Sequence, residues 1–499
     1  MLWELLDRGE PAAPALVVPG GPRLTYQELR DEVRRGAEVL AGLGLRQDRA
    51  VAMVFENGPE AVVLFLAAAM VAGAAPLNPT YTEAELRFYL EDVAAGALVV
   101  PPGGAAAARA ARPEGTMLVE AAVGADGRLR IEPQGRAASR GARAEPGQPG
   151  GDDVALVLHT SGTTGRPKRV PLRHRNLTAS AANTAATYQL GPGDVSLCVM
   201  PLFHVHGLVA SALSTLATGG TVVVPAPFSP LTFWPALREH RPTWYSAVPT
   251  IHRMVLARAR DGWPAGTETL RFVRSCSAAL APELMAETER RLGAPALEAY
   301  GMTEACHQIA SNPLPPAARR PGSVGLGTGV EVAVLDDGGA PLPSGTPGQV
   351  AIRGPNVIDG YAANPQANAE SFIGGWFRTG DQGLLDERGY LTLTGRIKEL
   401  INRGGEKISP REIDEVLLRH PAVAEAVAFG TPHPTLGEEV AAAVVLQGEA
   451  SERELLSHCR EQLAAFKVPR KLHVVEAIPR TATGKVQRRK VAEAVGAGR

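Results

Sequence analysis

The 499-residue sequence has few cysteines, almost no net charge and no long apolar run. Its four cysteines form no CxxC pair, which argues against a disulfide scaffold or a structural zinc site. The formal net charge of −1 excludes the broad basic surface typical of nucleic-acid-binding proteins. Residues 1–7 contain two acids where a signal peptide needs a basic start and an apolar run. We therefore expect a cytoplasmic protein with neither a nucleic-acid nor a membrane partner.

The composition is otherwise that of a globular protein. Hydrophobic residues make up 45% of the chain and charged residues 21%, and the length predicts two or more domains. The most apolar stretch, residues 61–77, is shorter than the ~20 residues that span a membrane, and it contains Gly73 and Pro76. We interpret this stretch as a buried core helix.

Short apolar runs separated by helical patterns indicate the fold class. The clearest runs are residues 50–55, 97–100, 154–158 and 221–224. Because turn residues bound each run, they are expected to be strands buried on both faces of mostly parallel sheets. The sequence therefore predicts an α/β protein built from layered subdomains.

The texture changes in the last third of the chain. Between about residues 327 and 390, short strands alternate with Gly/Pro turns, which predicts a β-rich subdomain. Beyond a predicted boundary near residue 395, Ser409 is expected to cap a helix that has Pro410 at its first position. We thus predict a large N-terminal domain over 1–395, including the β-rich subdomain, and a small α+β C-terminal domain over 396–499.

One segment, residues 158–168, combines glycines, hydroxyls and a terminal lysine. Glycines let the backbone approach a polyanion closely, while hydroxyls and N–H groups supply donors. The segment predicts a phosphate-binding loop, although the GxxxxGK[ST] pattern of a Walker A loop is absent. A solvated polar turn is the alternative interpretation. The polar and glycine positions are Thr160, Ser161, Gly162, Thr163, Thr164, Gly165 and Lys168.

Three further motifs follow along the chain. In residues 300–304 a threonine precedes a glutamate, a pair that could hold a phosphate and its Mg²⁺. Asp381 lies in a Gly-rich turn and is suited to a ribose diol, or simply to an Asx turn. In residues 479–489 a lysine follows a glycine among other basic residues. This segment is either a solvated basic surface or the source of a positive charge that moves to a reacting phosphate.

Together and in this order, the four motifs resemble those of the adenylate-forming superfamily of acyl-CoA synthetases, luciferases and peptide-synthetase adenylation domains. The resemblance covers essentially the whole chain. It implies an AMP-forming acid–thiol ligase with Mg²⁺ as cofactor and ATP and CoA as co-substrates, whose small C-terminal domain is mobile. Four segments look more narrowly like the oxalate–CoA ligase branch: residues 201–207, 274–279, 300–308 and 401–407.

The family pattern implies a role for individual residues. Glu304 would ligate Mg²⁺ and Thr303 would contact the α-phosphate. Glu298, Ala299 and Tyr300 would flank the adenine, and Asp381 and Arg396 would hold the ribose hydroxyls. Lys485 would bridge the acyl carboxylate and the α-phosphate during adenylation, and the small domain would rotate at Lys398. His204 occupies the gating position of the acid site. The implied ATP-binding set is Thr160, Ser161, Gly162, Thr163, Thr164, Gly165, Lys168, Glu298, Ala299, Tyr300, Thr303, Asp381, Arg396 and Lys485.

The acid and CoA sites are also implied by the resemblance. The acid would meet His204, His206, Ser277 and His307, with Arg274 nearby in sequence. Imidazole and hydroxyl donors suit a second carboxylate on a short acid, and oxalate is the smallest such acid. Lone histidines of this kind are also common as satisfied structural residues. The implied CoA-binding residues are Arg403, Gly404, Gly405 and Lys407.

Several alternatives stay open on the sequence alone. The acid could be malonate or a short-chain monocarboxylate, and the enzyme could load a carrier protein instead of CoA. A luciferase-like oxygenase and a non-catalytic nucleotide-binding protein fit less well. Arg169 departs from the family pattern, which usually has glycine there, and predicts a stiffer end to the phosphate loop. The sequence carries no indication of the oligomeric state.

Overall fold

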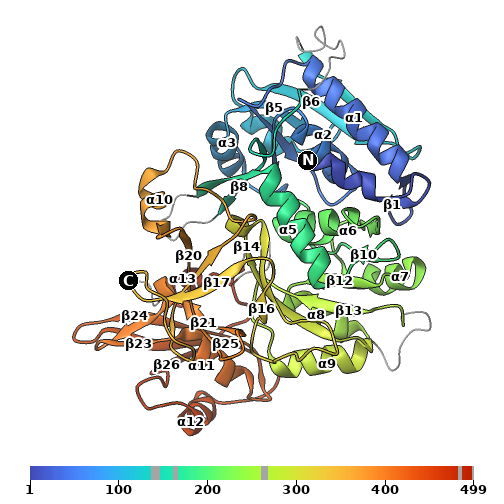
Figure 1. The fold of residues 1–499 in the computed structure, drawn as a ribbon. Helices are drawn as coiled ribbons and strands as arrows, with labels where there is room; N and C mark the ends of the chain where they lie inside the picture. The colour runs from blue at the N-terminus through green and yellow to red at the C-terminus, as the bar shows by residue number, and fades with distance from the viewer. Residues whose placement is uncertain (136–146, 161–166, 260–267, 481–485, 497–499) are drawn as a thin grey trace. The chain divides into compact units, whose positions relative to one another are not determined.

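The computed structural model describes residues 1–135, 147–160, 167–259, 268–480 and 486–496. The chain forms two compact units. Unit 1 comprises Met1–Glu331 with Arg353–Phe372, and unit 2 comprises Val332–Ile352 with Ile373–Arg499 (Figure 1). The predicted domain boundary near residue 395, beyond which a small C-terminal domain would rotate, stays a prediction.

A seven-stranded sheet forms the first layer of unit 1. Its strands are β3 (Ala50–Val54), β4 (Gly73–Leu77), β5 (Ala95–Val100), β6 (Met117–Val123), β7 (Leu129–Pro133), β8 (Val154–Thr160) and β9 (Lys168–Arg173). They lie in the order β7-β6-β5-β3-β4-β8-β9, and only the edge strands β7 and β9 pair antiparallel within this described sheet. Every residue of β3 and β5 is buried, as expected for parallel strands covered on both faces.

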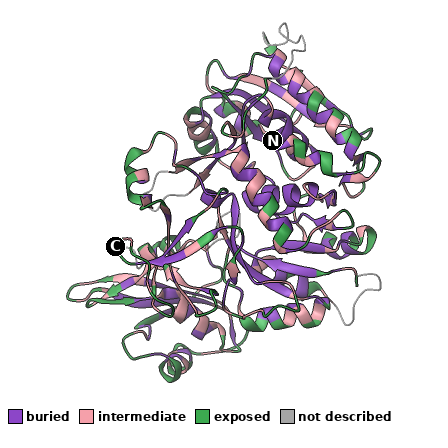
Figure 2. Ribbon diagram, viewed as in Figure 1, coloured by how far each residue is buried: buried purple, intermediate pink, exposed green. Residues whose placement is uncertain are grey.

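A nine-stranded sheet forms the second layer of unit 1. Its strands are β1 (Pro14–Val17), β2 (Arg23–Thr25), β10 (Val195–Leu197), β11 (Thr221–Val223), β12 (Trp244–Ala247), β13 (Phe272–Ser275), β14 (Ala296–Met302), β15 (His307–Ser311) and β16 (Leu326–Gly327). They lie in the order β16-β15-β14-β13-β12-β10-β11-β1-β2. β12 and β13 are buried throughout, and Figure 2 shows this central region in purple.

Helices and short helical turns cover these sheets. They are η1 (Trp3–Arg8), α1 (Tyr26–Gly42), α2 (Pro59–Ala69), α3 (Glu83–Asp92), α4 (Ala106–Ala111), α5 (His174–Thr187), η3 (His206–Leu213), α6 (Ser214–Leu216), α7 (Pro230–His240), α8 (Pro249–Arg258), α9 (Pro282–Leu292), η4 (Thr303–Ala305) and α10 (Pro365–Ser371). Thr25 and Glu28 form a capping box that begins α1, which packs against α2.

The single helix predicted for residues 61–77 is wrong. The stretch contains most of α2 and then all of β4. Both elements are almost wholly buried, so neither shows the alternation of polar and apolar residues that distinguishes a helix from a strand. The prediction that this run is buried is confirmed, but the spacing of its apolar residues does not distinguish a helix from a strand.

Unit 2 contains two five-stranded sheets. The first has β17 (Glu331–Leu335), β18 (Gly348–Arg353), β19 (Phe372–Ile373), β20 (Trp376–Leu385) and β21 (Leu391–Arg396), and it matches the predicted β-rich region. The second has β22 (Ile401–Arg403), β23 (Glu406–Ile408), β24 (Val423–His433), β25 (Gly437–Leu446) and β26 (Lys471–Val474). The helical elements are η5 (Ile397–Glu399), α11 (Pro410–Leu418), α12 (Glu452–Gln462) and α13 (Arg488–Ala494).

The start of α11 corrects one local prediction. The helix begins at Pro410, as expected, but the Ser409 side chain makes no capping hydrogen bond. Its hydroxyl donates instead to the Thr394 carbonyl at the end of β21. The serine therefore ties α11 to the preceding strand.

None of the helices in the described part of the chain combines the length and the apolar character that a membrane crossing requires.

Candidate functional site

The flanks of the predicted phosphate loop are adjacent in space. Strands β8 and β9 pair antiparallel, with Thr160 opposite Lys168. This register brings together the two ends of the segment that the sequence singled out. The intervening predicted residues Ser161, Gly162, Thr163, Thr164 and Gly165 lie outside the described residues, as does Lys485.

Arg169, the departure from the family pattern, fastens β9 to α3. Its guanidinium donates to the backbone carbonyl of Asp92, the last residue of α3. The Asp92 carboxylate also lies 2.9 Å from His159 Nε2, on β8. Both strands of the hairpin are thus held by one residue of α3.

A buried carboxylate lies next to these loop flanks within unit 1. Glu304, in η4, is 6% exposed. Its Oε1 accepts hydrogen bonds from Tyr361 Oη at 2.8 Å and from Thr160 Oγ1 at 3.4 Å. The Lys168 ammonium lies 4.4 Å from the centre of the Tyr361 ring. The structure therefore gathers the predicted Thr160, Lys168 and Glu304.

Tyr361 is a member of this cluster that sequence reasoning missed. Burial and the neighbouring Glu304 charge raise the pKa of Tyr361 well above its ordinary value. The phenol thus stays protonated and acts as a donor to the carboxylate. The backbone near Tyr361 also holds η4 in place, because the Ile358 N–H donates to the Glu304 carbonyl at 2.9 Å.

The residues predicted to flank adenine lie on β14. Glu298, Ala299 and Tyr300 are all buried. The Glu298 carboxylate accepts the Leu280 N–H at 3.0 Å, and its carbonyl accepts the Asn312 N–H at 3.0 Å. Glu298 therefore connects β14 to the turn after β13, while its contact with adenine stays a prediction.

Three of the predicted acid-site residues meet at the ends of different elements. His206 begins the π-helix η3, Ser277 follows β13, and His307 begins β15. Ser277 Oγ lies 3.2 Å from His206 Nδ1, and the rings of His206 and His307 are 4.7 Å apart. His204 joins through the backbone, because its Nδ1 accepts the His206 N–H at 3.1 Å. The four residues thus form one polar cluster, which we call the acid cluster.

The acid cluster surrounds Arg274, a residue of β13 with 0% exposure. No carboxylate of the described residues pairs with this guanidinium. Two of its partners, Tyr188 and Ser246, carry no motif and were missed by sequence reasoning, whereas Gln308 ends the 300–308 motif but was assigned no role. The guanidinium nitrogens lie 2.8 Å from Tyr188 Oη, 3.0 Å from Ser246 Oγ, 3.1 Å from Gln308 Oε1, 3.3 Å from His307 Nδ1 and 3.4 Å from His206 Nε2.

The backbone around the acid cluster is strained. Ser277, Cys306 and His307 have φ of 71°, 51° and 106°, in a region that side chains disfavour. Gly301 allows β14 and β15 to approach, since a Cβ there would lie 1.9 Å from the His307 carbonyl oxygen. Such strain persists only where the surrounding structure over-determines it, and it concentrates at functional sites.

In unit 2, the predicted ribose-binding residues form a pair. Asp381 on β20 lies opposite Arg396 on β21, and Arg396 Nε is 3.2 Å from Asp381 Oδ1. The carboxylate is buried, whereas the arginine is exposed. The two residues thus lie side by side, and their contact with the ribose stays a prediction.

The predicted CoA-binding loop is the turn between β22 and β23. Gly404 and Gly405 have φ of 59° and 94°, which glycine adopts without strain, and Lys407 is exposed. Arg403 instead pairs with Glu439, with Nε at 2.6 Å and Nη2 at 3.2 Å from its carboxylate oxygens. Lys398, at the predicted hinge, lies in η5.

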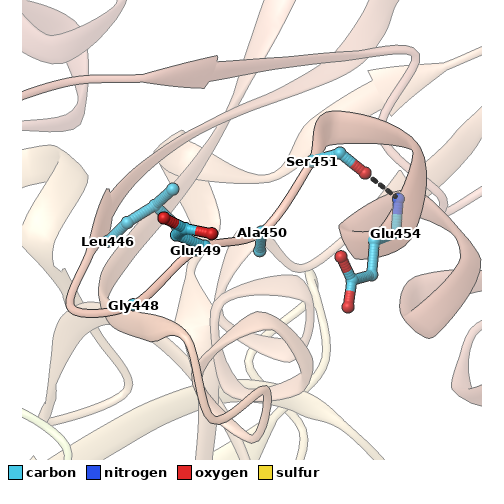
Figure 3. A pocket seen from close by; sticks show the side chains of 6 residues that line it. All are labelled: Leu446, Gly448, Glu449, Ala450, Ser451 and Glu454. Atoms are coloured by element: carbon cyan, nitrogen blue, oxygen red, sulfur yellow. Dashed lines mark hydrogen bonds between the residues drawn. The ribbon is translucent and has the colours of Figure 1, made fainter.

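A shallow depression elsewhere in unit 2 has the wrong chemistry for a nucleotide. Figure 3 shows two carboxylates, those of Glu449 and Glu454, among its lining side chains, and the Ser451 hydroxyl accepting the Glu454 N–H at 3.2 Å. No basic residue is among the described residues that line it. The depression would therefore repel a polyphosphate.

The chain belongs to the AMP-binding enzyme family, which matches residues 6–362. The C-terminal domain of AMP-binding enzymes matches residues 412–485. The predicted membership of the adenylate-forming superfamily is therefore confirmed.

Among its relatives are two oxalate–CoA ligases. That of Arabidopsis thaliana is 45% identical over 99% of this chain and 97% of its own length, and that of Saccharomyces cerevisiae is 47% identical over 96% and 94%. A sulfoacetate–CoA ligase of Cupriavidus necator is 39% identical over 96% and 94%. The predicted likeness to the oxalate–CoA ligase branch is confirmed.

Solved structures share the fold. ATP-bound MatB from Rhodopseudomonas palustris is 33% identical, with a TM-score of 0.89 over 99% of this chain and 98% of its own. MenE from Bacillus subtilis, in complex with ATP and magnesium ion, is 30% identical, with a TM-score of 0.84 over 97% and 98%. The predicted α/β fold class, with its smaller C-terminal part, is confirmed.

Proposed function

We propose that this protein is an AMP-forming acid–CoA ligase that converts oxalate, ATP and CoA to oxalyl-CoA, AMP and diphosphate. The observation that carries the choice of acid is the meeting of His206, Ser277 and His307 around the fully buried Arg274. The names of the two oxalate–CoA ligase relatives support the same choice.

The charge of the acid cluster favours an acid with a second anionic group. One carboxylate of oxalate attacks ATP, and the other accepts hydrogen bonds from His307 and from the Ser277 hydroxyl, which His206 contacts. The buried guanidinium has no carboxylate partner among the described residues, so a bound anion offsets its charge. An acid with a methyl group there leaves buried donors unpaired, at about 1–3 kcal/mol each.

The chemistry of adenylation is a problem of charge. The acid carboxylate attacks the α-phosphate, a new C–O–P linkage forms, and diphosphate leaves with the electron pair of the broken P–O bond. Because two anions must approach each other, positioning and electrostatic stabilisation supply most of the rate. Lys168 and Lys485 provide positive charge, and Thr303 donates to the α-phosphate.

Glu304 fits a magnesium ion, because Mg²⁺ is commonly held by one or two carboxylates together with phosphate oxygens. When bound, the ion neutralises charge on the phosphates. Tyr361 and Thr160 orient the carboxylate for this task through their hydrogen bonds to Oε1. Asp381 and Arg396 hold the ribose, and Glu298, Ala299 and Tyr300 flank the adenine.

Thioester formation follows adenylation. The CoA thiol attacks the acyl carbon, loses its proton, and displaces AMP. We assign this step to a second orientation of the small domain over 396–499, reached by rotation at Lys398, which withdraws Lys485 and presents Arg403, Gly404, Gly405 and Lys407 to CoA.

A second candidate acid is one whose distal anion is not a carboxylate. The 39% identity to a sulfoacetate–CoA ligase favours testing sulfoacetate beside malonate. Loading of a carrier protein in place of CoA is the other alternative. A cytoplasmic location stays a prediction.

The first test measures diphosphate release with ATP, CoA and Mg²⁺ for oxalate, malonate, sulfoacetate, acetate and butanoate. The proposal expects oxalate to give the highest kcat/KM, and activity to fall when the metal is removed with a chelator. Preference for acetate or butanoate would overturn the acid assignment and leave the ligase. No AMP from any acid would overturn the ligase itself.

His307→Ala separates acid binding from ATP binding. Loss of one buried donor should lower kcat/KM for oxalate about tenfold or more, while the KM for ATP changes little. Unchanged oxalate kinetics would remove His307 from the acid site. Lys485→Ala separates the two half-reactions. This variant should lose most of its adenylation activity but largely keep thioester formation from a supplied acyl-adenylate.

A further inference from the structure

The hydrogen-bond directions around Arg274 can be worked out from its chemistry. A guanidinium stays charged, carries only N–H donors and has no acceptor. Each atom that it hydrogen-bonds must therefore accept. This condition constrains the two imidazoles of the acid cluster, since a neutral imidazole has one donor nitrogen and one acceptor nitrogen.

At His307 the constraint is direct. Arg274 Nη2 lies 3.3 Å from His307 Nδ1, so Nδ1 accepts. The ring proton of the neutral imidazole then belongs on Nε2. The same guanidinium nitrogen also donates to Gln308 Oε1 at 3.1 Å, which fixes its orientation on this side of the cluster.

At His206 the constraint passes through a serine. Arg274 Nη1 donates to Ser246 Oγ at 3.0 Å, which leaves the Ser246 proton for another acceptor. His206 Nε2 lies 2.6 Å from that oxygen and 3.4 Å from Nη1, so both neighbours approach it as donors. The ring proton of His206 therefore belongs on Nδ1, 3.2 Å from Ser277 Oγ.

We propose that Arg274 is a positioning residue that sets the tautomers of both histidines, placing the proton of His206 on Nδ1 and that of His307 on Nε2. In each ring the donor is then the nitrogen that does not face the guanidinium. The inference rests on the proposed function, in which His307 donates to the distal carboxylate of the acid and His206 donates to Ser277, whose hydroxyl donates to that carboxylate.

The arrangement has a chemical advantage. In each ring the guanidinium contacts one nitrogen as a donor, so the other nitrogen is left as a donor of fixed direction. The other titratable groups that face Arg274 are the Tyr188 hydroxyl and the Cys276 thiol. Burial raises the pKa of Tyr188, so this hydroxyl stays protonated and adds no negative charge.

The direct test observes the ring nitrogens. Long-range ¹H–¹⁵N spectra of the full chain, labelled with ¹⁵N-histidine, distinguish protonated from unprotonated ring nitrogens. The resonances of His206 and His307 are assigned among the eleven histidines by comparing His206→Gln and His307→Gln. The proposal expects Nδ1–H at His206 and Nε2–H at His307. The opposite tautomer at either ring would overturn it.

Ser246→Ala is the sharpest variant, because it removes one hydroxyl and only the relay to His206. Only the longer 3.4 Å contact with Arg274 Nη1 then holds His206 Nε2 as an acceptor, so the His206 resonances should shift toward a tautomer mixture, whereas those of His307 should stay unchanged. Equal shifts at both rings, or none at either, would contradict the relay. Arg274→Lys, which keeps the charge but loses the planar fork, should shift both rings.

Arg271→Lys is the matched control. Arg271 pairs with Asp194 at 2.6 Å and donates to the Tyr188 carbonyl at 3.2 Å, without a hydrogen bond to either histidine. Both tautomers should be unchanged in this variant. If Arg271→Lys shifts them as Arg274→Lys does, the effect is general loosening and the proposal fails.

Activity supplies a separate readout. Arg274→Lys should raise the KM for oxalate about tenfold or more, since buried donors lose their direction, while the KM for ATP stays within about twofold. A tenfold rise in both constants would contradict a positioning role. Expected tautomers without oxalate turnover would overturn the proposed acid and uphold the proton assignment, so the two failures are distinguishable.

Discussion

Two buried arginines differ in what surrounds their charge. In unit 2, Arg488 lies 2.6 Å from Asp414 Oδ2 and 3.0 Å from Glu399 Oε2, and it donates to the Ala428 carbonyl at 2.9 Å. In unit 1, Arg274 contacts hydroxyl, amide and imidazole groups and no described carboxylate. The first charge is paired with carboxylates of the protein, whereas the second is surrounded by neutral hydrogen-bonding groups.

Arg403 lies between these two cases. It pairs with Glu439, and Arg470 Nε approaches the same carboxylate at 3.7 Å. Its side chain is largely buried, but its one carboxylate is shared. The three arginines thus form a series in which the number of carboxylate partners falls from Arg488 through Arg403 to Arg274, the residue proposed to position the acid site.

The largest effect on stability is expected at Arg488. Arg488→Met leaves Asp414 and Glu399 without their cation and should lower the free energy of unfolding of unit 2 by about 3 kcal/mol, because removing one partner strands a buried charge. The Arg488 side chain is only 19% exposed, so solvent compensates little. Urea denaturation followed by circular dichroism measures the change.

The neighbouring arginine provides the control for this measurement. Arg489 is 87% exposed and pairs with Glu493 along the same helix, so Arg489→Met should cost less than about 0.5 kcal/mol. Equal losses in the two variants would mean that the carboxylates around Arg488 contribute nothing beyond helix propensity.

Arg274→Met should destabilise unit 1 less, by about 1–3 kcal/mol, because it leaves hydroxyl and amide groups without a donor but strands no charge. The larger consequence should be loss of the stabilisation that oxalate gives to the wild-type protein in thermal denaturation. Persistence of that stabilisation in Arg274→Met would break the contrast between the two arginines.

Gly301→Ala moves a neighbour of Arg274 without changing any charge. The added Cβ would lie 1.9 Å from the His307 carbonyl oxygen, so the start of β15 must shift. We expect the KM for oxalate to rise about tenfold, equivalent to about 1.4 kcal/mol. Gly193→Ala, where the Cβ meets nothing within 4 Å, should leave it unchanged. Equal kinetics in both variants would show that the acid site does not depend on this close approach.

Local patterns predicted much of the fold. The buried parallel strands and the β-rich region follow from short apolar runs and turn residues, because these signals are contained in a few neighbouring residues. Residues 61–77 and Ser409 were misassigned for the opposite reason. Residues 61–77 divide into a helix and a strand because of the buried elements that each part joins, and no local period marks this division. The Ser409 hydroxyl is engaged by the carbonyl of Thr394, 15 residues earlier in the chain.

The candidate site shows the same division. His206, Ser277 and His307 could be singled out because each lies in a recognisable motif, and the structure brings them together. Tyr188 and Ser246 carry no such pattern, and Gln308 ends a motif that gave it no role, because all three act through the Arg274 side chain that they contact. A partner defined by tertiary contact leaves no local signal.

The smallest effect is expected at Arg403. Burial alone would raise the pKa of Glu439, but hydrogen bonds from Arg403 and the Val440 N–H hold it below its ordinary value. Under the proposed role of Arg403 in CoA binding, this carboxylate would compete with the CoA phosphates for the guanidinium. Glu439→Gln should therefore lower the KM for CoA about two- to threefold, in line with the modest strength of a partly exposed ion pair. Glu438→Gln, which changes a carboxylate that accepts the Asn402 N–H, should have no such effect. If Glu439→Gln raises the KM for CoA instead, Glu439 must hold Arg403 in the orientation that binds CoA. The carboxylate would then assist CoA binding by this arginine and would not compete with it.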